Sequence, residues 1–176
     1  LAKKPSISFY NLWIRKDWLD KLGLQIPATL DELFAVAKAF TEKDPDGNGK
    51  ADTYGITGQK LSTFDPILSA YGVGVPDSFY LKNGKVMNSL VDPGMKEALA
   101  FIKGMIDAGV VDPDILANTG TQHEKKAFQG KAGMIWHGFP RMTSPTAVNE
   151  YKAVNPNAEW VQVPALKGPG GQFAGS

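Results

Sequence analysis

The fold class follows from residues 13–33, which read WIRKDWLDKLGLQIPATLDEL. This stretch starts inside Ser6–Ile14, a run of aromatic and β-branched residues that predicts a buried strand. Arg15–Leu22 then predicts a short helix, which Gly23 ends because glycine readily adopts the left-handed conformation of a helix terminus. A strand that passes directly into a helix favours an α/β or α+β fold.

The end of the same stretch predicts a longer helix with a defined start. The Thr29 hydroxyl can accept a hydrogen bond from the Glu32 amide while the Glu32 carboxylate reaches back, which is a capping box. This helix is expected to run to about Thr41. Its core-facing side chains recur at helical spacing and are Leu30, Leu33, Phe34, Ala37 and Phe40.

Turn and cap signals predict the other elements. Strands are expected at 54–57, 132–136 and 160–164, a hairpin around Asn83-Gly84, and helices over 65–72, 92–109, 121–129 and 140–154. Asp65 and Asp92, each followed by proline, are expected to cap their helices. The helix after Asp92 is expected to bury Met95, Leu99, Ile102 and Ile106.

Composition narrows the function classes. The chain has 176 residues, of which 43% are hydrophobic and 21% charged, as in globular proteins. Its formal net charge of +1 gives no electrostatic case for binding nucleic acid or an anionic membrane surface. Without cysteine, the chain forms no disulfide, thiolate zinc site or cysteine nucleophile. No stretch approaches the roughly 20 apolar residues that a membrane-spanning helix needs.

Residues 44–53, DPDGNGKADT, have the oxygen spacing of a calcium loop. The candidate ligands stand at alternate positions and are the side chains of Asp44, Asp46, Asn48 and Asp52 and the carbonyl of Lys50. Gly49 occupies the sixth position, where such a loop turns sharply, but Gly55 stands where an EF-hand has a bidentate glutamate. A bound calcium ion would therefore be structural. The alternative is a solvated turn after the helix.

Aromatic side chains gather near predicted strand ends and helix starts, where α/β folds place ligands. They are Trp13, Phe64, Trp136 and Phe139. His137 and Arg141 add an imidazole and a guanidinium to the Trp136 junction, a set that could stack on a sugar and bond its hydroxyls. The alternative is core packing, which spacing alone favours for Trp13, Trp18 and Trp160.

Catalytic signals are weak. Nothing resembles a nucleophile elbow, a Ser-x-x-Lys pair, a zinc-binding His-Glu-x-x-His helix or a P-loop. His123 neighbours Glu124 and Lys125 on a polar helix, and we expect it on a solvated face. The sequence therefore favours a protein that is not an enzyme.

Five segments, in order, resemble the family 1 extracellular solute-binding proteins, which are the receptors of ABC importers. These segments are residues 13–33, 44–55 (DPDGNGKADTYG), 82–92 (KNGKVMNSLVD), 97–112 (EALAFIKGMIDAGVVD) and 127–138 (AFQGKAGMIWHG). The 44–55 loop is typical of the lipoprotein branch of Gram-positive bacteria. The last two segments resemble those of maltose-type and oligosaccharide-binding proteins.

The resemblance implies a two-lobed α/β receptor of the type II periplasmic-binding-protein fold, which closes on a solute like a hinge. Residues 1–176 would form most of the second lobe, and the first lobe and the lipid anchor would lie outside this chain. We expect a monomeric, extracellular cell-surface lipoprotein, associated with the membrane only by its anchor. It would bind a carbohydrate, an oligosaccharide first, and deliver it to the permease.

Site residues also follow from the resemblance. In alginate-oligosaccharide-binding relatives a similar loop holds Ca²⁺, which would add Thr53 to the ligand set. Arg15 and Lys60 would accommodate an anionic solute such as a uronate. The cleft residues expected in this lobe are Trp13, Arg15, Gln59, Phe64, Trp136, His137 and Arg141.

Two other function classes remain open. A glycan-active enzyme, or an accessory domain of one, would place two carboxylates across a cleft, roughly 5–10 Å apart. A calcium-stabilised interaction module would have no concave aromatic patch at the strand ends.

Overall fold

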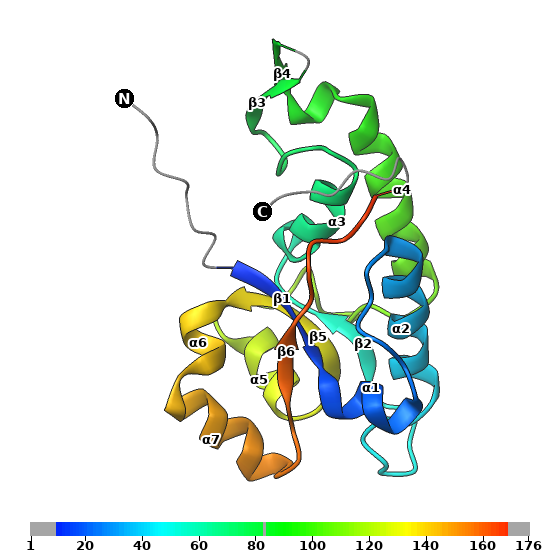
Figure 1. Ribbon diagram of the computed structural model, residues 1–176, viewed down its shortest axis with the longest axis vertical. Coiled ribbons are helices and arrows are strands. Elements are labelled where there is room, and N and C mark those ends of the chain that lie inside the picture. The colour runs from blue at the N-terminus through cyan, green and yellow to red at the C-terminus, as the bar shows by residue number, and fades with distance from the viewer. Residues whose placement is uncertain (1–9, 83, 169–176) are drawn as a thin grey trace.

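A four-stranded sheet lies at the centre of the protein in the computed structural model, which describes residues 10–82 and 84–168 (Figure 1). Its strands are β1 (Tyr10–Arg15), β2 (Tyr54–Thr57), β5 (Ala132–Gly138) and β6 (Trp160–Gln162). They are ordered β2-β5-β1-β6, with β2 parallel to β5 and β1 antiparallel to both of its neighbours. The predicted Ser6–Ile14 strand is found from Tyr10 onward, and residues 6–9 lie outside the described residues.

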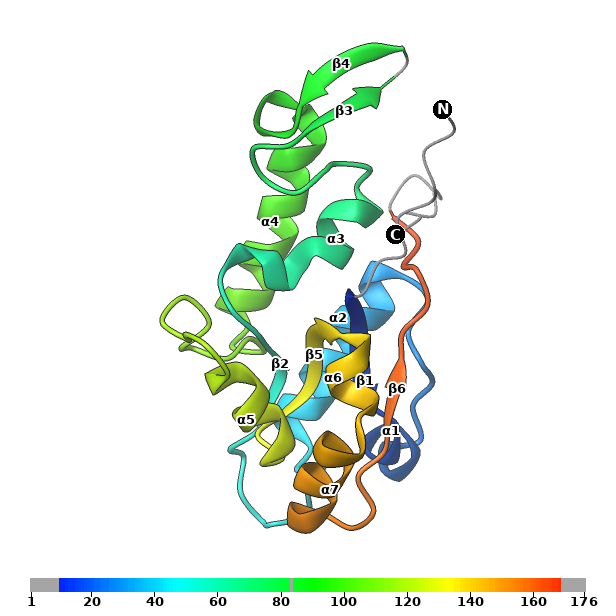
Figure 2. The ribbon, with the colours of Figure 1, turned by 90° about the vertical axis from the view of Figure 1, so that its left-hand side faces the viewer.

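Helices cover both faces of this sheet (Figures 1 and 2). One set comprises α1 (Lys16–Leu22), α2 (Leu30–Glu42), α3 (Asp65–Ala70) and α4 (Pro93–Asp107). The other set comprises α5 (Gln122–Phe128), α6 (Phe139–Thr143) and α7 (Pro145–Val154). Short 3-10 helices occupy Leu61–Phe64 and Ser89–Val91. None of the helices in the described ranges has the length and apolar content to cross a membrane.

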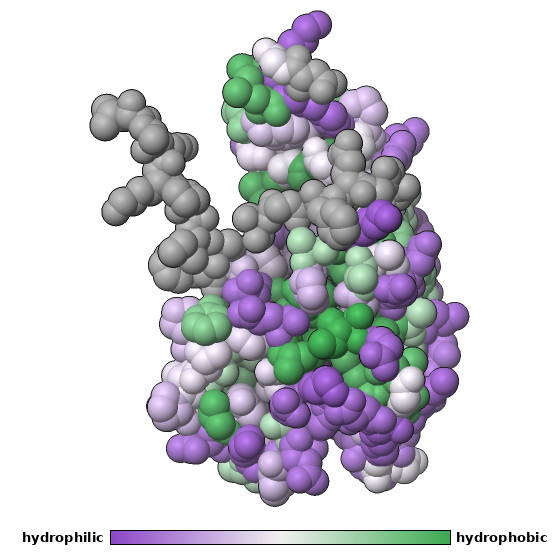
Figure 3. Space-filling view, viewed as in Figure 1, coloured by the Kyte–Doolittle hydropathy of each residue, from purple (hydrophilic) through white to green (hydrophobic). Residues whose placement is uncertain are grey.

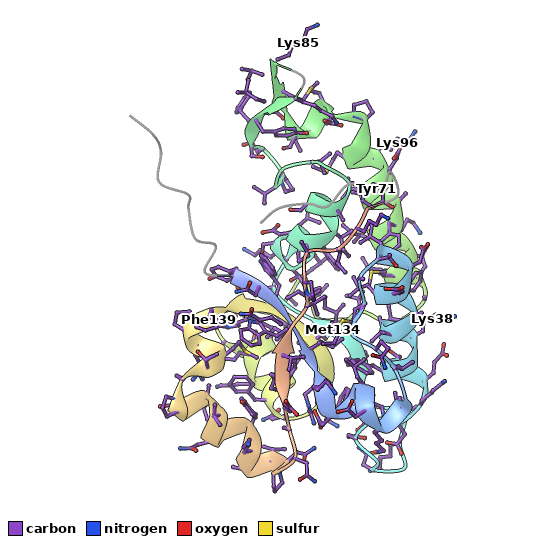
Figure 4. All side chains as sticks on the ribbon, in the orientation of Figure 1. Lys38, Tyr71, Lys85, Lys96, Met134 and Phe139 are labelled. Carbon is purple, nitrogen blue, oxygen red and sulfur yellow. The ribbon has the colours of Figure 1, made fainter. Side chains whose placement is uncertain are left out.

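The two helical layers follow from the alternation of side chains along each strand. Ile14 of β1 and Met134 of β5 belong to the larger core, formed with α1–α4. Trp13 and Ile135, their neighbours along the strands, belong to a second core, formed with α5–α7. Figure 4 shows Met134 within the body of the protein, whereas Lys38 of α2 points away from it. The predicted α/β class is confirmed.

A β-hairpin projects beyond α4, at one end of the molecule (Figure 2). It pairs β3 (Phe79–Lys82) with β4 (Lys85–Asn88), which confirms the hairpin that the Asn83-Gly84 turn predicted. Gly84 has φ +75°, a conformation that favours glycine, and Asn83 lies outside the described residues.

Two of the predicted caps are present. The Glu32 amide donates to Thr29 Oγ1 (3.2 Å), and the Thr29 amide donates to Glu32 Oε2 (3.2 Å). Asp92 Oδ1 accepts from the Gly94 amide (2.8 Å) at the start of α4. These local bonds satisfy amides that have no partner inside the helix.

Three predictions about helices were wrong. Asp65 does not cap α3, because it is the first residue of that helix and Phe64 occupies the cap position. Leu99 and Ile106 are 40% and 49% exposed, since α4 turns Ala98 and Met105 to the core instead. The helix expected over 140–154 is interrupted.

That interruption lies at Ser144, between α6 and α7. Ser144 precedes Pro145, and a residue before proline avoids the helical conformation. It is extended (φ −64°, ψ 145°) and its hydroxyl accepts from the Ala147 amide (3.2 Å), so it ends one helix and caps the next.

A buried carboxylate holds the chain where it leaves β2. Asp112 is 1% exposed and accepts hydrogen bonds from Thr57 Oγ1 (2.7 Å), Asn118 Nδ2 (3.0 Å) and Lys126 Nζ (2.9 Å). Asn118 Nδ2 also donates to the Gly58 carbonyl (2.9 Å). Burial alone would raise the pKa of Asp112, but these donors outweigh it and hold that pKa below its usual value.

The Lys126→Ala variant tests this anchor. It leaves the buried carboxylate of Asp112 without its cation, and we expect the free energy of unfolding to fall by about 2 kcal/mol. The fall is not larger because the Lys126 side chain keeps some contact with water. Lys125→Ala, exposed on the same helix, is the matched control and should change little. Urea denaturation of both variants measures the difference, and equal stabilities would refute the anchoring role.

Close packing imposes a second constraint, at Gly133 in the middle of β5. A Cβ atom there would lie 2.1 Å from Phe40 Cδ2 and 2.9 Å from Trp18 Cε3. The rings of Trp18 and Phe40 pack edge to face with centroids 5.3 Å apart, so neither has room to move away.

Gly133→Ala should therefore lower the free energy of unfolding by about 2 kcal/mol through overpacking. Gly104→Ala provides the opposite case, because a Cβ there meets nothing within 4 Å on helix α4. It should raise stability by about 0.5–1 kcal/mol. Thermal or urea unfolding of the two variants checks both signs, and a neutral Gly133→Ala would contradict the packing argument.

Candidate ligand-binding site

A pocket of about 510 Å³ opens where the parallel strands β2 and β5 end. The carboxyl ends of parallel strands are the usual place for a ligand in α/β folds. The residues that line it are Tyr10, Gln59, Ser62, Thr63, Asp65, Gly120, His123, Trp136 and His137. An adjoining pocket of about 330 Å³ shares Tyr10 and Trp136 and extends along residues 162–166.

Aromatic rings form one wall of the site. The Tyr10 ring, 54% exposed, lies 6.2 Å from the Trp136 ring and 6.4 Å from the His137 ring, between centroids. Phe139 stands just beyond, at the start of α6, and packs on Trp13 at 6.0 Å (Figure 4). The Tyr10 and Trp136 rings, which line the pocket, offer flat apolar faces to a ligand.

Two stacked histidines continue the wall. Their ring centroids are 5.5 Å apart, and burial lowers the pKa of both His123 and His137, so both are neutral at pH 7. His137 Nδ1 accepts from the Gly138 amide (2.8 Å), which leaves Nε2 to donate to Glu124 Oε2 (3.2 Å). The hydrogen bonds thus define the His137 tautomer.

Arg141 is held in ion pairs. Its guanidinium donates two hydrogen bonds to Glu124 (2.8 and 2.7 Å) and a third to Glu150 (2.7 Å). The hydrogen bonds to Glu124 are the main cause of a raised Arg141 pKa. Arg141 thus ties α5 to α6 and α7 and does not line the pocket.

Two polar atoms of the pocket residues have no hydrogen-bond partner among the described residues although they are buried. They are Asp65 Oδ1 and His123 Nδ1. Burial raises the pKa of Asp65 to about 6. An unsatisfied buried polar atom destabilises a fold, and a ligand that bonds to it recovers that cost.

Sequence reasoning missed the role of both residues. Asp65 has the pattern of a helix cap, and His123 was expected on a solvated face, yet His123 is only 9% exposed. The one feature of the sequence that indicates Asp65 as a pocket residue is its position shortly after the end of β2. No feature of the sequence indicates His123 as a pocket residue, because the side chain is buried only by the packing of α5 on β5.

Three of the expected cleft residues line the pocket, namely Gln59, Trp136 and His137. Trp13 does not: it is buried in the second core and its Nε1 donates to the His137 carbonyl (3.1 Å). Phe64 is buried in the larger core.

Arg15 is also absent from the pocket. It is 2% exposed, donates to both carboxylate oxygens of Asp17 (2.7 and 2.6 Å) and lies 4.6 Å from the centroid of the Trp18 ring. The expectation that Arg15 meets an anionic solute therefore fails here, and Lys60 does not line the pocket either.

The loop over 44–53 brings its carboxylates together through hydrogen bonds. Asn48 Nδ2 donates to Asp46 Oδ2 (2.8 Å) and to Asp52 Oδ1 (3.0 Å). Asp44 accepts from three backbone amides, those of residues 47–49. Burial raises the pKa of Asp46, and the neighbouring Asp44 adds to the rise. Lys131 Nζ pairs with Asp52 Oδ2 at 2.6 Å.

Two observations limit this loop as a metal site. Thr53 Oγ1 is buried and donates to the Phe40 carbonyl (2.6 Å), so this hydroxyl points away from the loop. Within residues 10–82 and 84–168, no three carboxylate or histidine side chains stand close enough together to hold a metal ion.

Figure 3 shows the face of the protein that is seen in Figure 1. Apolar side chains gather in the middle of that face, with hydrophilic ones around them.

Comparison with known proteins places the chain in a family. A family model described as bacterial extracellular solute-binding protein matches residues 5–175. The chain is 35% identical to lipoprotein LipO of Bacillus subtilis (strain 168), over 90% of this chain and 32% of LipO. It is 38% identical to the polygalacturonan/rhamnogalacturonan-binding protein YtcQ of the same organism, over 76% of this chain and 27% of YtcQ.

A solved structure has a similar fold. The structure of the ABC-transporter substrate-binding protein FusA of Streptococcus pneumoniae, in complex with kestose, has a TM-score of 0.75 and 29% identity. The match covers 94% of this chain and 33% of that one. This chain therefore spans about a third of the length of the relatives it matches. It belongs to the bacterial extracellular solute-binding protein family, with the periplasmic-binding-protein-like fold that its five segments predicted.

Proposed function

We propose that this chain is the second lobe of the solute-binding component of an ABC importer. The whole receptor binds an oligosaccharide between its lobes and delivers it to the permease. Family membership supports this proposal, as do the names of the relatives, which include a fructooligosaccharide transporter protein and a polygalacturonan-binding protein. The lipoprotein LipO supports a place at the cell surface.

One observation carries the proposal, the composition of the pocket wall. The rings of Tyr10 and Trp136 supply apolar faces, and Gln59, Asp65 and His123 supply hydrogen-bonding groups beside them. A sugar has the complementary surface, because its C–H faces are apolar and its hydroxyls point outward around the ring. The interaction-module alternative predicts no such concave aromatic patch.

Binding without catalysis is the better interpretation of the same wall. A glycosidase needs two carboxylates across its cleft. Among the described residues that line the pocket, Asp65 is the only acid. The nearby Glu124 is held by Arg141 and His137. This arrangement favours a receptor over a glycan-active enzyme.

Trp136→Ala tests the aromatic wall. Loss of a central aromatic contact typically costs about 2 kcal/mol, so the Kd for the bound oligosaccharide should rise roughly thirtyfold. Isothermal titration of the full-length receptor with a panel of neutral and acidic oligosaccharides identifies the ligand first and then measures the change.

Phe139→Ala is the matched control, because this exposed ring lies near the pocket but does not line it. Its affinity should stay close to that of the unmodified receptor. If Trp136→Ala binds as tightly as Phe139→Ala, the pocket is not the ligand site.

We also propose that residues 44–52 bind a structural Ca²⁺. The ligands would be the side chains of Asp44, Asp46, Asn48 and Asp52 and the carbonyl of Lys50. Oxygen atoms are the donors that Ca²⁺ prefers, and Asn48 already holds Asp46 and Asp52 near each other. A second FusA structure is described as an EF-hand mutant, which supports a calcium loop in this relative. The Thr53 hydroxyl does not fit the set, since it already donates to Phe40.

Calcium addition to the EDTA-treated full-length receptor should raise its Tm. At a hundredfold excess over Kd the ion contributes about 2.7 kcal/mol. Asp46→Asn should abolish most of this gain, whereas Asp20→Asn, an acid outside the loop, should retain it. An identical Tm in EDTA and in calcium would rule out the site.

A further inference from the structure

The charges around the pocket point to one class of oligosaccharide. This inference rests on the proposed function. We propose that this site binds a neutral, hydroxyl-rich glycan and rejects a uronate. Asp65 is the residue that distinguishes the two. The inference goes beyond the relatives' names, which include both neutral and acidic glycans.

No cation faces the pocket among the described residues. Within residues 10–82 and 84–168, the lining contains no Lys or Arg, and its only charged side chain is Asp65. Both lining histidines, His123 and His137, have pKa values lowered by burial and are neutral at pH 7. A carboxylate on a ligand would find no opposite charge in this wall.

The guanidinium of Arg141, which pairs with Glu124 behind the pocket wall, is already neutralised. The single positive charge of Arg141 is shared between Glu124 and Glu150, which leaves that network with one negative charge in excess. Glu124 is buried and lies 3.2 Å from His137, a lining residue, so this excess lies directly behind the pocket wall. Like charges repel more strongly in a partly buried site than in water.

Hydrogen-bond chemistry leads to the same conclusion. Asp65 Oδ1 is buried, and it has no donor among the residues that the structure describes. An ionised carboxylate only accepts hydrogen bonds, so a sugar hydroxyl can satisfy Asp65 but a uronate carboxylate cannot. His123 Nδ1 is also unpartnered, and a hydroxyl can bond to it as donor or acceptor.

The first test compares matched sugars. Isothermal titration of the full-length receptor at pH 7.5 uses trisaccharides of glucose, galactose, mannose and fructose, and the corresponding trimers of glucuronate, galacturonate and mannuronate. The tightest ligand should be neutral. A uronate as the tightest ligand would overturn this inference and leave the proposed function intact, whereas binding of no sugar would overturn both.

The second test is Asp65→Asn. The amide oxygen of Asn still accepts a hydrogen bond but carries no charge, so the neutral ligand should bind about three- to thirtyfold more weakly. The ratio of the Kd for the matched uronate to the Kd for the neutral ligand should be smaller in the variant than in the unmodified receptor. Asp107→Asn, an exposed acid on α4, removes the same charge away from the pocket and should change neither value.

A stability measurement separates ligand binding from a structural role. Burial raises the pKa of Asp65 from its ordinary value of 3.8 to about 6, so the charged form destabilises the free protein above that pH. Asp65→Asn should therefore raise the Tm of the ligand-free receptor at pH 7.5. The gain should shrink as the pH falls through 6 and disappear only below about pH 3, where the Asp65 carboxyl is protonated in both folded and unfolded states. A variant with lower Tm and unchanged relative affinities would contradict the proposal.

Discussion

The burial of β1 on both faces is the constraint on which the rest of the structure depends. Ile14 faces the helices of one layer and Trp13 those of the other, so neither face of the sheet can be left to water. Helices must then cover both sides. The chain consequently returns to place β5 beside β1 and parallel to β2, and this arrangement brings the ends of β2 and β5 to one edge. The pocket lies at that edge.

Ion pairs neutralise cations near this edge of the sheet and so limit the groups that the pocket offers to a ligand. Arg141 binds two glutamates and Lys126 is held by the Asp112 anchor, whereas Arg15 is buried with Asp17 at the end of β1 away from the pocket. Each pair joins segments of the fold or fixes a strand end. What remains in the pocket is a set of rings, neutral imidazoles and one carboxylate, which suits recognition of hydroxyl groups better than recognition of charge.

Much of the fold could be predicted because its signals are local. The capping box at Thr29, the cap at Asp92 and the turn at Gly84 each act within a few residues, and all three are present. The buried face of α4 was predicted less well, because the spacing of Leu99 and Ile106 fits a helix face but cannot say which face meets the core. That choice depends on the segments that pack against it.

The sequence by itself determined the α/β class, the order of elements and the family resemblance, since periodicity, caps and ordered segments are properties of the chain alone. Three of the cleft residues that it predicted, Gln59, Trp136 and His137, line the pocket. Only the tertiary structure decided that Arg15 is a core residue and that Asp65 and His123 face the pocket. The reason is physical: a charged side chain is available to a ligand only if no partner from a distant segment neutralises it, and such partners are set by packing.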